Sequence, residues 1–330
     1  MALILVTGAA GFIGFSVSRA LLARGDSVIG VDNLNAYYDV TLKEARLEQL
    51  TADKKFSFHK LDIADRDTML KLAEEFPTMD GIIHLAAQAG VRHSLTDPYT
   101  YVTSNVMGQT VLLELARRLN GLKHFVYASS SSVYGGNTKL PFSVEDPVEQ
   151  PNSLYAATKR TGELFGFTYA HLYGIPATGL RFFTVYGPWG RPDMAAFIFT
   201  RQIIAGEAIK VFNRGEMWRD FTYIDDIVSG VVRVLDRPPA DDRKNGGAPP
   251  HRIYNLGNHR SEKLTDFIAE IEQALQRKAK VTLEPMQPGD VARTCADIEG
   301  SRRDLGFEPL TPISVGIPKF IDWYKGYYGV

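Results

Sequence analysis

The chain has 330 residues, of which 45% are hydrophobic and 23% are charged, a composition typical of globular proteins with enough apolar mass for a large core. Its 37 basic and 38 acidic residues give a formal net charge of −1, which excludes a general electrostatic attraction to nucleic acid or to an anionic membrane surface. The single cysteine, Cys295, excludes an internal disulfide, and no Cys/His spacing typical of a metal site is present. We therefore expect no metal, no nucleic-acid partner, no membrane partner and a cytoplasmic location.

Short β-rich runs alternate with helical stretches through the first half of the chain. The first run, 4–6, leads into a glycine loop and is too short for a transmembrane helix, so it indicates a buried strand. The runs are continuously apolar, which is typical of strands covered on both faces in a parallel sheet with βαβ crossovers. The expected strands are 4–6, 28–31, 56–59, 81–85, 124–127 and 177–183, and the expected helices are 15–24 and one that begins near Ser153.

The pattern becomes irregular after about residue 185. A segment rich in Pro, Gly, Asp and Lys, 237–250, predicts an exposed loop. The strand-like run 252–256 indicates a return to the first domain, and 265–276 has apolar residues at helical spacing. We predict an α/β fold with a Rossmann-type doubly wound parallel sheet and a smaller, mostly C-terminal α/β substrate-binding lobe. The predicted division assigns 1–184 and 225–257 to the Rossmann domain, and 185–224 and 258–330 to the lobe.

Three glycines follow the first predicted strand and open the first helix. Glycine is needed where the chain turns sharply, where backbone approaches a pyrophosphate and where a helix packs closely on a strand, and the free N–H groups of the helix then face the phosphates. Asp32 ends the second strand, where a carboxylate can accept from both ribose hydroxyls and would repel a 2′-phosphate, which favours NAD over NADP. The alternative is a flexible turn. The predicted cofactor contacts here are Gly8, Gly11, Phe12, Ile13, Gly14 and Asp32.

Tyr155 and Lys159 stand four residues apart, which places them on one face of a helix. A phenol has an ordinary pKa near ~10 and is a poor base at neutral pH, but a nearby ammonium and a positive nicotinamide ring would favour the phenolate and lower that pKa. Lysine can also hold the nicotinamide ribose, so both residues are predicted to contact the cofactor as well as to act in catalysis. The alternative is an ordinary amphipathic helix with a surface lysine.

A run of four serines, 129–132, comes directly after the fifth predicted strand. The carboxyl end of a parallel strand is where open α/β sheets bind ligands. Hydroxyls at this place predict a surface that hydrogen-bonds a polyol or an oxyanion, although the run could also be a polar loop. We predict Ser130 to be the third catalytic residue, polarising the reacting oxygen beside Tyr155.

The G-x-x-G-x-x-G spacing of the glycine loop resembles the extended short-chain dehydrogenase/reductase family. Asp62-Ile63 after the third strand, Leu85-Ala86-Ala87 after the fourth and Asn105 in an N-V-x-G helix match the same family. On their own, Asp62 and Asn105 would more often be a turn residue and a helix-packing polar group. The resemblance implies additional NAD contacts at Asn33, Asp62, Ile63, Leu85, Ala86, Ala87 and Asn105.

The chain is similar across essentially its whole length to the sugar-nucleotide branch of that family. The matching motifs are R-F-F-T-V-Y-G-P at 181–188, R-D-F-T-Y-I-D-D at 219–226 and Gly289-Asp290. The resemblance implies that Arg219 binds the nucleotide diphosphate, that Asp290 reaches the nucleotide ribose and that Arg293 is a further diphosphate contact. The alternative for Arg219 is a salt bridge to Asp225 or Asp226.

Within the branch, enzymes that dehydrate or decarboxylate the 4-keto sugar carry an acidic residue where this chain has Ser131 and Ser132. Elimination is therefore disfavoured, and C4 epimerisation is implied. Thr184, the P-W-G-R-P-D-M run at 188–194 and the Met286–Asp290 run resemble UDP-glucuronate 4-epimerases, which implies conversion of UDP-glucuronate to UDP-galacturonate. The sugar carboxylate would be held by Arg191, whose alternative is an exposed loop arginine, together with Ser131, Ser132 and Thr184.

Other functions stay open on the sequence. The nearest are a 4-epimerase of UDP-glucose/galactose or of a UDP-N-acetylhexosamine, then a UDP-glucuronate decarboxylase, and from a different class a non-catalytic nucleotide-binding module. Such modules commonly lose the Tyr/Lys pair that this chain retains. The family commonly dimerises through a four-helix bundle, so the resemblance also implies a homodimer formed by the predicted helices 99–119 and 153–173.

Overall fold

The core of the molecule is a parallel sheet whose strands, in chain order, are β1 (Leu3–Thr7), β2 (Ser27–Asp32), β3 (Phe56–Lys60), β4 (Gly81–His84), β5 (His124–Ser130), β6 (Ala177–Phe182) and β11 (His251–Leu256). Their spatial order is β11-β6-β5-β4-β1-β2-β3, and every neighbouring pair is parallel. A computed structural model of the chain describes residues 1–287 and 289–330, so Pro288 of the Met286–Asp290 run lies outside the described residues.

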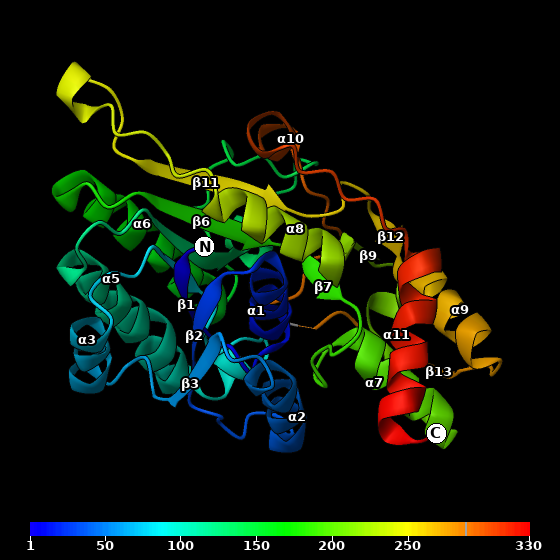
Figure 1. Cartoon of the computed structure of the whole chain (residues 1–330). Helices are drawn as coiled ribbons and strands as arrows, with labels where there is room; N and C mark the ends of the chain where they lie inside the picture. The colour runs from blue at the N-terminus through cyan, green and yellow to red at the C-terminus, as the bar shows by residue number, and fades with distance from the viewer. Residues whose placement is uncertain (288) are drawn as a thin grey trace.

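Helices cover both faces of this sheet (Figure 1). One face carries α1 (Phe12–Arg24), α2 (Val40–Thr51) and α8 (Ile224–Leu235), and the other carries α3 (Arg66–Glu75), α5 (Gly108–Arg118) and α6 (Leu154–Tyr173). The order of the strands reverses between β1 and β4. In such sheets the crevice at the carboxyl ends of the two diverging strands is the place for a ligand. The predicted α/β class with a Rossmann-type doubly wound sheet is confirmed.

The segment that leads into α5 is a continuous helical stretch with a widened turn. It begins with α4 (Pro98–Tyr101), passes through the π-helical η2 (Val102–Met107) and continues into α5. π-Helical turns occur frequently at functional sites. Short 3-10 turns complete the connections at η1 (His93–Leu95), η3 (Ser131–Tyr134), η4 (Phe212–Gly215) and η5 (Arg243–Asn245).

A second, smaller lobe lies beside the sheet, where Figure 1 draws the red C-terminal helix. Its elements are β7 (Thr184–Tyr186), α7 (Ala195–Ala205), β8 (Ala208–Val211), β9 (Trp218–Arg219), β10 (Phe221–Tyr223), β12 (Glu262–Lys263), α9 (Leu264–Leu275), β13 (Lys280–Leu283) and α11 (Ile313–Tyr328). α9 packs against α7 and α11, and the strands pair as β7 with β10, β8 with β13 and β9 with β12. The remaining helix, α10 (Glu299–Leu305), packs on β11 and α8 instead.

The chain returns to the sheet as the sequence predicted, because β11 pairs with β6 over its whole length. The residue-by-residue division into two domains stays a prediction. β5 is three residues longer than predicted and continues through Ser129 and Ser130, so only Ser131 and Ser132 of the serine run lie in the following turn. Along residues 1–287 and 289–330, no helix combines the length and the hydropathy that crossing a bilayer requires.

Candidate active site

A cavity of about 750 Å³ opens at the carboxyl ends of β1, β2, β4 and β5 and extends to α7 of the smaller lobe. The fold therefore brings the cofactor residues, the catalytic residues and most of the substrate residues predicted from the sequence around one space. The predicted residues that line it are Gly8, Gly11, Phe12, Ile13, Gly14, Asp32, Asn33, Asp62, Ile63, Leu85, Ala86, Ala87, Ser130, Ser131, Ser132, Tyr155, Lys159, Thr184, Arg191, Arg219 and Asp290.

The glycine loop forms a tight cradle between β1 and α1. Gly8 has a φ of +73°, and a Cβ on it would lie 2.7 Å from the backbone nitrogen of Ala86. A Cβ on Gly14 would lie 2.0 Å from the carbonyl oxygen of Gly8. Gly11 caps α1 without a side-chain hydrogen bond, so the first N–H groups of the helix are available to an anion. This geometry fits the approach of a pyrophosphate to bare backbone.

We expect Gly14→Ala to weaken retention of the dinucleotide by at least about tenfold, or more than about 1.4 kcal/mol. The added Cβ meets a backbone oxygen that cannot move without opening the cradle. The measurement is the amount of nucleotide released from purified protein by acid. Gly326→Ala on α11 is the matched control because nothing lies within 4 Å of its Cβ. Equal nucleotide content in both variants would contradict the assignment of the loop.

Asp32 closes the ribose side of the same cradle. Its Oδ2 accepts from the backbone N–H of Ala10 at 3.2 Å, and its Oδ1 accepts from the N–H of Leu34 at 2.8 Å. Asn33 donates to the carboxylate of Asp62 at 3.0 Å, which joins two predicted contacts. These bonds hold the Asp32 carboxylate at the end of β2 on the cavity wall. An acid in that place suits a ribose with free hydroxyls and disfavours a 2′-phosphate.

Tyr155 and Lys159 lie on the first two turns of α6, which begins after Ser153 accepts a hydrogen bond from the N–H of Ala156. The Lys159 Nζ lies 6.0 Å from the centroid of the Tyr155 ring and donates to the carbonyl of Ala128 at 3.0 Å. Burial lowers the pKa of Lys159 to about 8. The helical face predicted from the spacing thus points into the cavity.

The predicted lowering of the Tyr155 pKa by Lys159 is not what the protein alone produces. Burial raises the pKa of the Tyr155 phenol, while a hydrogen bond with Ser130 and the charge of Arg191 act to lower it. The desolvation of the phenolate outweighs both favourable contributions because the ring is enclosed by its neighbours, among them Tyr101 at 6.1 Å between ring centroids. A further positive charge is needed before the phenolate is favoured.

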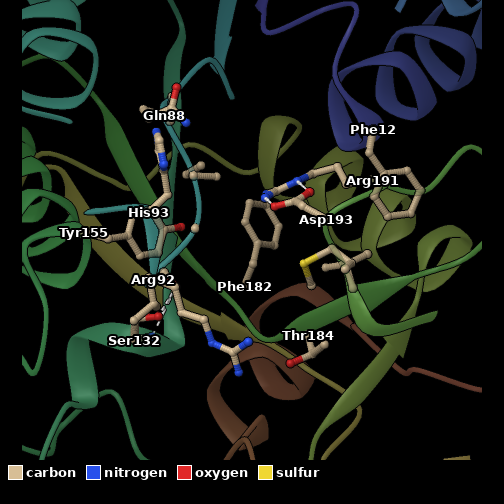
Figure 2. Close-up of a pocket in the computed structure, with 18 of the residues that line it drawn as sticks. Phe12, Gln88, Arg92, His93, Ser132, Tyr155, Phe182, Thr184, Arg191 and Asp193 are labelled. Carbon is tan, nitrogen blue, oxygen red and sulfur yellow. Dashed lines mark hydrogen bonds and ion pairs between the residues drawn. The ribbon is translucent and has the colours of Figure 1, made fainter. Parts of the chain in front are cut away.

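The serines at the end of β5 divide into two roles. Ser129 is 2% exposed, and its hydroxyl donates to Glu163 at 2.6 Å, so it is not free for a ligand. Ser130 accepts from the N–H of Ser132 at 3.1 Å and lies within a hydroxyl-to-hydroxyl distance of 3.1 Å from it. Figure 2 shows Ser132 and Tyr155 on one side of the cavity. Ser130, Ser131 and Ser132 are the hydroxyls that face the space.

Arg191 lies on the opposite side of the cavity and is not an exposed loop arginine. Its Nε and Nη2 donate to the two carboxylate oxygens of Asp193 at 3.0 and 2.5 Å (Figure 2). Tyr37, from the loop after β2, donates to the same carboxylate at 3.2 Å. Although burial disfavours its charge, Asp193 raises the pKa of Arg191, so the guanidinium stays charged. Thr184 also lines the cavity.

A second group of charges, Arg92, Arg219 and Asp290, also lines the cavity. Asp290 accepts from Arg92 at 2.9 Å, and Arg92 lies over the ring of Phe212 at 4.4 Å. Arg219 donates to the carbonyls of Trp218 and Ala292 at 2.9 and 3.3 Å. Burial and the neighbouring Arg92 lower the pKa of Arg219, and Asp290 opposes this. Two guanidinium groups close enough to repel each other form a suitable place for a diphosphate.

The alternative for Arg219, a salt bridge to Asp225 or Asp226, does not occur among residues 1–287 and 289–330. Both carboxylate oxygens of Asp226 instead accept from the backbone N–H groups of Leu310 and Thr311, at 3.2 and 3.1 Å. Asp226 therefore fixes the segment before α11. Arg219 instead lines the cavity.

Two predicted residues lie away from the cavity. Asn105 is 3% exposed in η2, where it bonds both the N–H and the carbonyl of Gln88, at 2.8 and 3.0 Å, and the hydroxyl of Thr158 at 3.0 Å. Its amide is used to join the loop after β4 to α6, which is the packing role given above as its alternative. Arg293 is exposed and donates to Ser261 at 3.2 Å. Neither residue is among those that line the cavity, and the cofactor contact of Asn105 and the diphosphate contact of Arg293 stay predictions.

Several polar residues of the site were missed by the sequence reasoning. Arg46 on α2 is fully buried and donates to the carbonyl of Ala10 at 2.8 Å and to those of Trp189 and Gly190 at 2.6 and 3.1 Å. It therefore ties the cofactor loop to the segment that carries Arg191. Arg46 and the residues it bonds lie far apart in the sequence, so no local sequence pattern predicts these contacts. The other missed residues are Tyr37, Lys43, Arg92 and Asp193.

Comparison with known proteins gives one consistent result. Residues 4–257 match the model of the NAD-dependent epimerase/dehydratase family. UDP-glucuronate 4-epimerase 3 of Arabidopsis thaliana is 49% identical over 332 residues, which cover 98% of this chain and 77% of that protein. The UDP-glucuronic acid 4-epimerase of Bacillus cereus, solved with UDP-glucuronic acid and NAD, superposes with a TM-score of 0.90 at 34% identity, covering 99% of this chain and 100% of that one. The UDP-glucose 4-epimerase of Thermotoga maritima, solved with UDP-glucose, gives a TM-score of 0.86 at 28% identity, with 99% of each chain covered.

Proposed function

Because the chain belongs to the NAD-dependent epimerase/dehydratase family, we propose that it inverts C4 of a UDP-hexuronic acid and so interconverts UDP-glucuronate and UDP-galacturonate. One observation carries the choice of substrate. The cavity holds the phenol of Tyr155 on one side and the guanidinium of Arg191 on the other, close enough for each to act on the other's pKa. A base for a sugar hydroxyl and a cation for a sugar carboxylate therefore face the same space.

NAD is held in this proposal by the backbone of the glycine loop, by the carboxylate of Asp32 and by Lys159. The fit rests on the two glycines whose Cβ atoms would collide with backbone and on the uncapped start of α1. Bound NAD supplies the hydride acceptor for C4 and a positive ring that favours the phenolate. The nucleotide of the substrate is held at the other end, with Arg219 and Arg92 on the diphosphate and Asp290 near the ribose.

Tyr155 removes the proton of the C4 hydroxyl and returns it when the sugar is reduced again. Ser130 polarises the same oxygen, because its hydroxyl lines the cavity beside the phenol and acts to lower the pKa of Tyr155. The 4-keto sugar turns about its link to the diphosphate between the two half-reactions and presents its other face. Arg219 keeps the nucleotide in place during this turn, so the intermediate is not released.

The C6 carboxylate is held by Arg191 with the hydroxyls of Ser131, Ser132 and Thr184. The 4-keto sugar is a β-keto acid and loses CO₂ when its carboxylate bond stands perpendicular to the plane of the carbonyl. A firmly held carboxylate suppresses this loss, so positioning controls which product forms. No acidic side chain occupies the serine positions, which removes the group that an elimination would use.

The deciding experiment incubates the purified protein with UDP-glucuronate, without added NAD, and resolves the nucleotide sugars by chromatography. We expect UDP-galacturonate as the product and NAD in the acid extract of the protein. Parallel incubations with UDP-glucose and a UDP-N-acetylhexosamine test the uncharged substrates. A UDP-pentose as the main product, or conversion of the neutral sugars alone, would overturn the proposal.

We further propose that two copies of the chain associate through the outer faces of η2 and α6, in the cytoplasm that the free Cys295 suits. These two elements pack side by side, and several of their large apolar side chains are exposed. Val111 and Leu113 of α5, in contrast, are buried in the core. An apolar surface of this kind marks an interaction site. The exposed residues are Val102, Met107, Leu164, Phe167 and Leu172, together with Tyr99 of the adjoining α4.

We expect Leu164→Glu to convert the protein to a monomer, because the side chain is 51% exposed and a charge there could not be buried against a second copy. Light scattering after size-exclusion chromatography gives the mass. Val315→Glu on α11, at a site 45% exposed, is the matched control and should leave the mass unchanged. A wild-type protein with the mass of one chain would disprove the dimer.

A further inference from the structure

We propose that Glu163 and Arg181 form a positioning device that holds the turn carrying Ser130–Ser132 in register with Tyr155 and Lys159. The inference rests on the proposed function only in taking Tyr155 and Ser130 as the reacting groups. It names residues that touch neither sugar nor cofactor and act through the catalytic turn.

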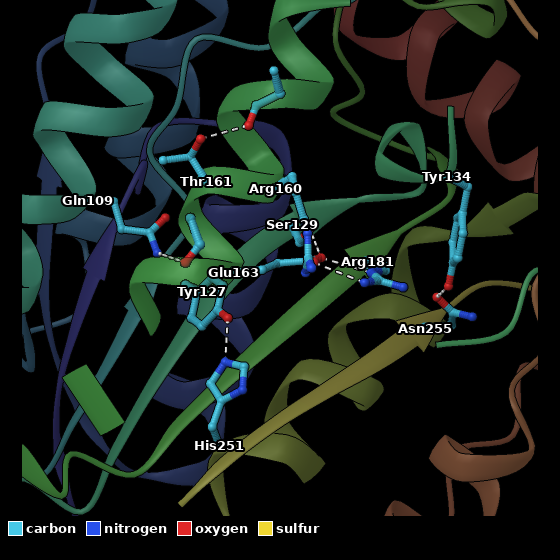
Figure 3. A network of polar contacts seen from close by, with 12 residues as sticks. Gln109, Tyr127, Ser129, Tyr134, Arg160, Thr161, Glu163, Arg181, His251 and Asn255 are labelled. Atoms are coloured by element: carbon cyan, nitrogen blue, oxygen red, sulfur yellow. Dashed lines mark hydrogen bonds and ion pairs between the residues drawn. The ribbon is translucent and has the colours of Figure 1, made fainter. Parts of the chain in front are cut away.

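Glu163 continues the catalytic face of α6. It stands one helical turn after Lys159 and two turns after Tyr155, and its side chain is 1% exposed. Its carboxylate accepts from Ser129 at 2.6 Å and from two nitrogens of Arg181 at 2.8 and 2.9 Å (Figure 3). Two side chains of α6 thus bond consecutive residues of β5. Lys159 donates to the carbonyl of Ala128, and Glu163 accepts from the hydroxyl of Ser129.

The bonded residues lie on a single rung of the sheet. Ser129 of β5 pairs in register with Arg181 of β6, and Arg181 pairs in register with Asn255 of β11. One further pair, Ser130 with Phe182, follows this rung before the chain enters the turn at Ser131. A carboxylate that bonds Ser129 and Arg181 together fixes both the separation of the two strands and their height relative to α6.

The far end of the turn is held by the same arginine. The guanidinium of Arg181 lies over the ring of Tyr134, 4.8 Å from its centroid, and the Tyr134 hydroxyl donates to Asn255 at 2.7 Å (Figure 3). Tyr134 ends η3, which carries Ser131 and Ser132. The turn between Ser129 and Tyr134 is therefore fixed at both ends by one buried ion pair.

Stability alone does not account for such a pair. Desolvation of two buried charges offsets most of their attraction, and apolar residues of similar size are often as stabilising. The pair does supply a fixed geometry, and misplacement of a reacting group by about 1 Å can lower a rate by about 100-fold. The geometry at stake is the placement of the Ser130 hydroxyl beside the Tyr155 phenol, since both line the cavity and Ser130 acts to lower the pKa of Tyr155.

The test compares two single-group deletions on the same carboxylate. Ser129→Ala removes the hydroxyl that joins Glu163 to β5 without leaving a buried charge unpaired. Arg160→Ala removes a second partner, which donates to Glu163 at 2.9 Å from a side chain that is 33% exposed and lies on α6 itself. Removing Glu163 itself would orphan Arg181 and threaten folding, so Ser129→Thr, which retains the hydroxyl, serves as the conservative variant.

We expect Ser129→Ala to lower kcat by about tenfold or more with KM and NAD content unchanged. Loss of the Ser130 bond disfavours the phenolate, so the rising limb of the kcat–pH profile should move to higher pH. Amide hydrogen exchange in 130–134 should quicken. Ser129→Thr should restore all three properties, and Arg160→Ala should leave them as in the wild type.

Equal effects of Ser129→Ala and Arg160→Ala, or an unchanged kcat, pH profile and exchange rate in Ser129→Ala, would overturn the inference. Its failure is distinguishable from failure of the proposed function. The exchange measurement needs no substrate, and the kinetic comparison can use any UDP-sugar that the wild type converts. A protein that epimerises only a neutral sugar would contradict the substrate assignment and leave the role of Glu163 and Arg181 testable.

Discussion

Tyr155→Phe is expected to lower kcat by about 1,000-fold while the protein keeps its NAD. The phenol is the group placed to exchange a proton with the C4 hydroxyl, and positioned acid–base groups contribute about 100- to 10,000-fold to a rate. The Phe ring keeps the edge contact with Tyr101 at 6.1 Å, so packing is retained. Product formation in single-time assays and NAD released by acid give the two measurements.

Tyr169→Phe is the matched control for this variant. Tyr169 lies on the same helix, and its hydroxyl donates to Glu114 at 2.8 Å, away from the cavity. Its loss should leave kcat unchanged. If Tyr155→Phe kept more than about a tenth of the wild-type kcat, acid–base work by this phenol would be excluded. Loss of NAD from Tyr155→Phe would instead indicate a binding role.

The role of Tyr155 as a base also predicts how the activity depends on pH. Burial raises the pKa of Tyr155, so the phenol is protonated at neutral pH until a bound positive ring offsets the desolvation. Activity should therefore rise with pH along the ionisation of Tyr155 in the loaded protein. The sequence predicted that Lys159 and the nicotinamide ring would together supply this effect. In the structure the Lys159 ammonium donates to the carbonyl of Ala128, and burial lowers its pKa to about 8.

The predicted site residues that the fold brings to the cavity include those whose placement depends on a few adjacent residues. The glycine loop needs bare backbone at Gly8 and Gly14, and the structure shows why any Cβ there would collide. The Tyr155/Lys159 pair depends only on the pitch of a helix. The alternation of apolar strands with helices was sufficient for the sheet because parallel strands must be buried on both faces.

The parts that escaped prediction depend on contacts between distant segments. α2 was not predicted because its buried face carries Lys43 and Arg46. These two charged residues interrupt the helical spacing of apolar residues by which such a helix is recognised. Arg46 satisfies its guanidinium with main-chain carbonyls of Ala10 and Trp189, which carry no side-chain signature. Asn105 has the residue type of a ligand contact, but its amide is consumed by Gln88. Whether such a polar side chain binds a ligand or packs within the protein depends on tertiary contacts, which the local sequence does not show.

Arg191→Ala is expected to raise KM for UDP-glucuronate by about 100-fold and to increase the share of UDP-pentose among the products. A buried pair between an arginine and a carboxylate costs about 2–5 kcal/mol when one partner is truncated, and about 2.8 kcal/mol corresponds to 100-fold. Asp193 accepts from Nε and Nη2 of Arg191 in the structure, so the sugar carboxylate must use the other N–H groups of the guanidinium or displace Asp193 from it. The carboxylate is then less firmly held once Arg191 is removed, and decarboxylation of the keto acid competes with re-reduction.

Three comparisons separate this reading from a general disturbance of the loop. UDP-glucose lacks the carboxylate, so any turnover of it should keep its KM in Arg191→Ala. The double variant Arg191→Ala/Asp193→Ala removes the orphaned acid and should show the same product ratio as the single variant. Arg191→Lys keeps the charge without the planar guanidinium, so its KM for UDP-glucuronate and its share of UDP-pentose should lie between those of the wild type and of Arg191→Ala. Because Arg191 also lowers the pKa of Tyr155, the pH profile should move upward with every substrate, and an unchanged UDP-glucuronate KM and product ratio would remove the carboxylate from this arginine.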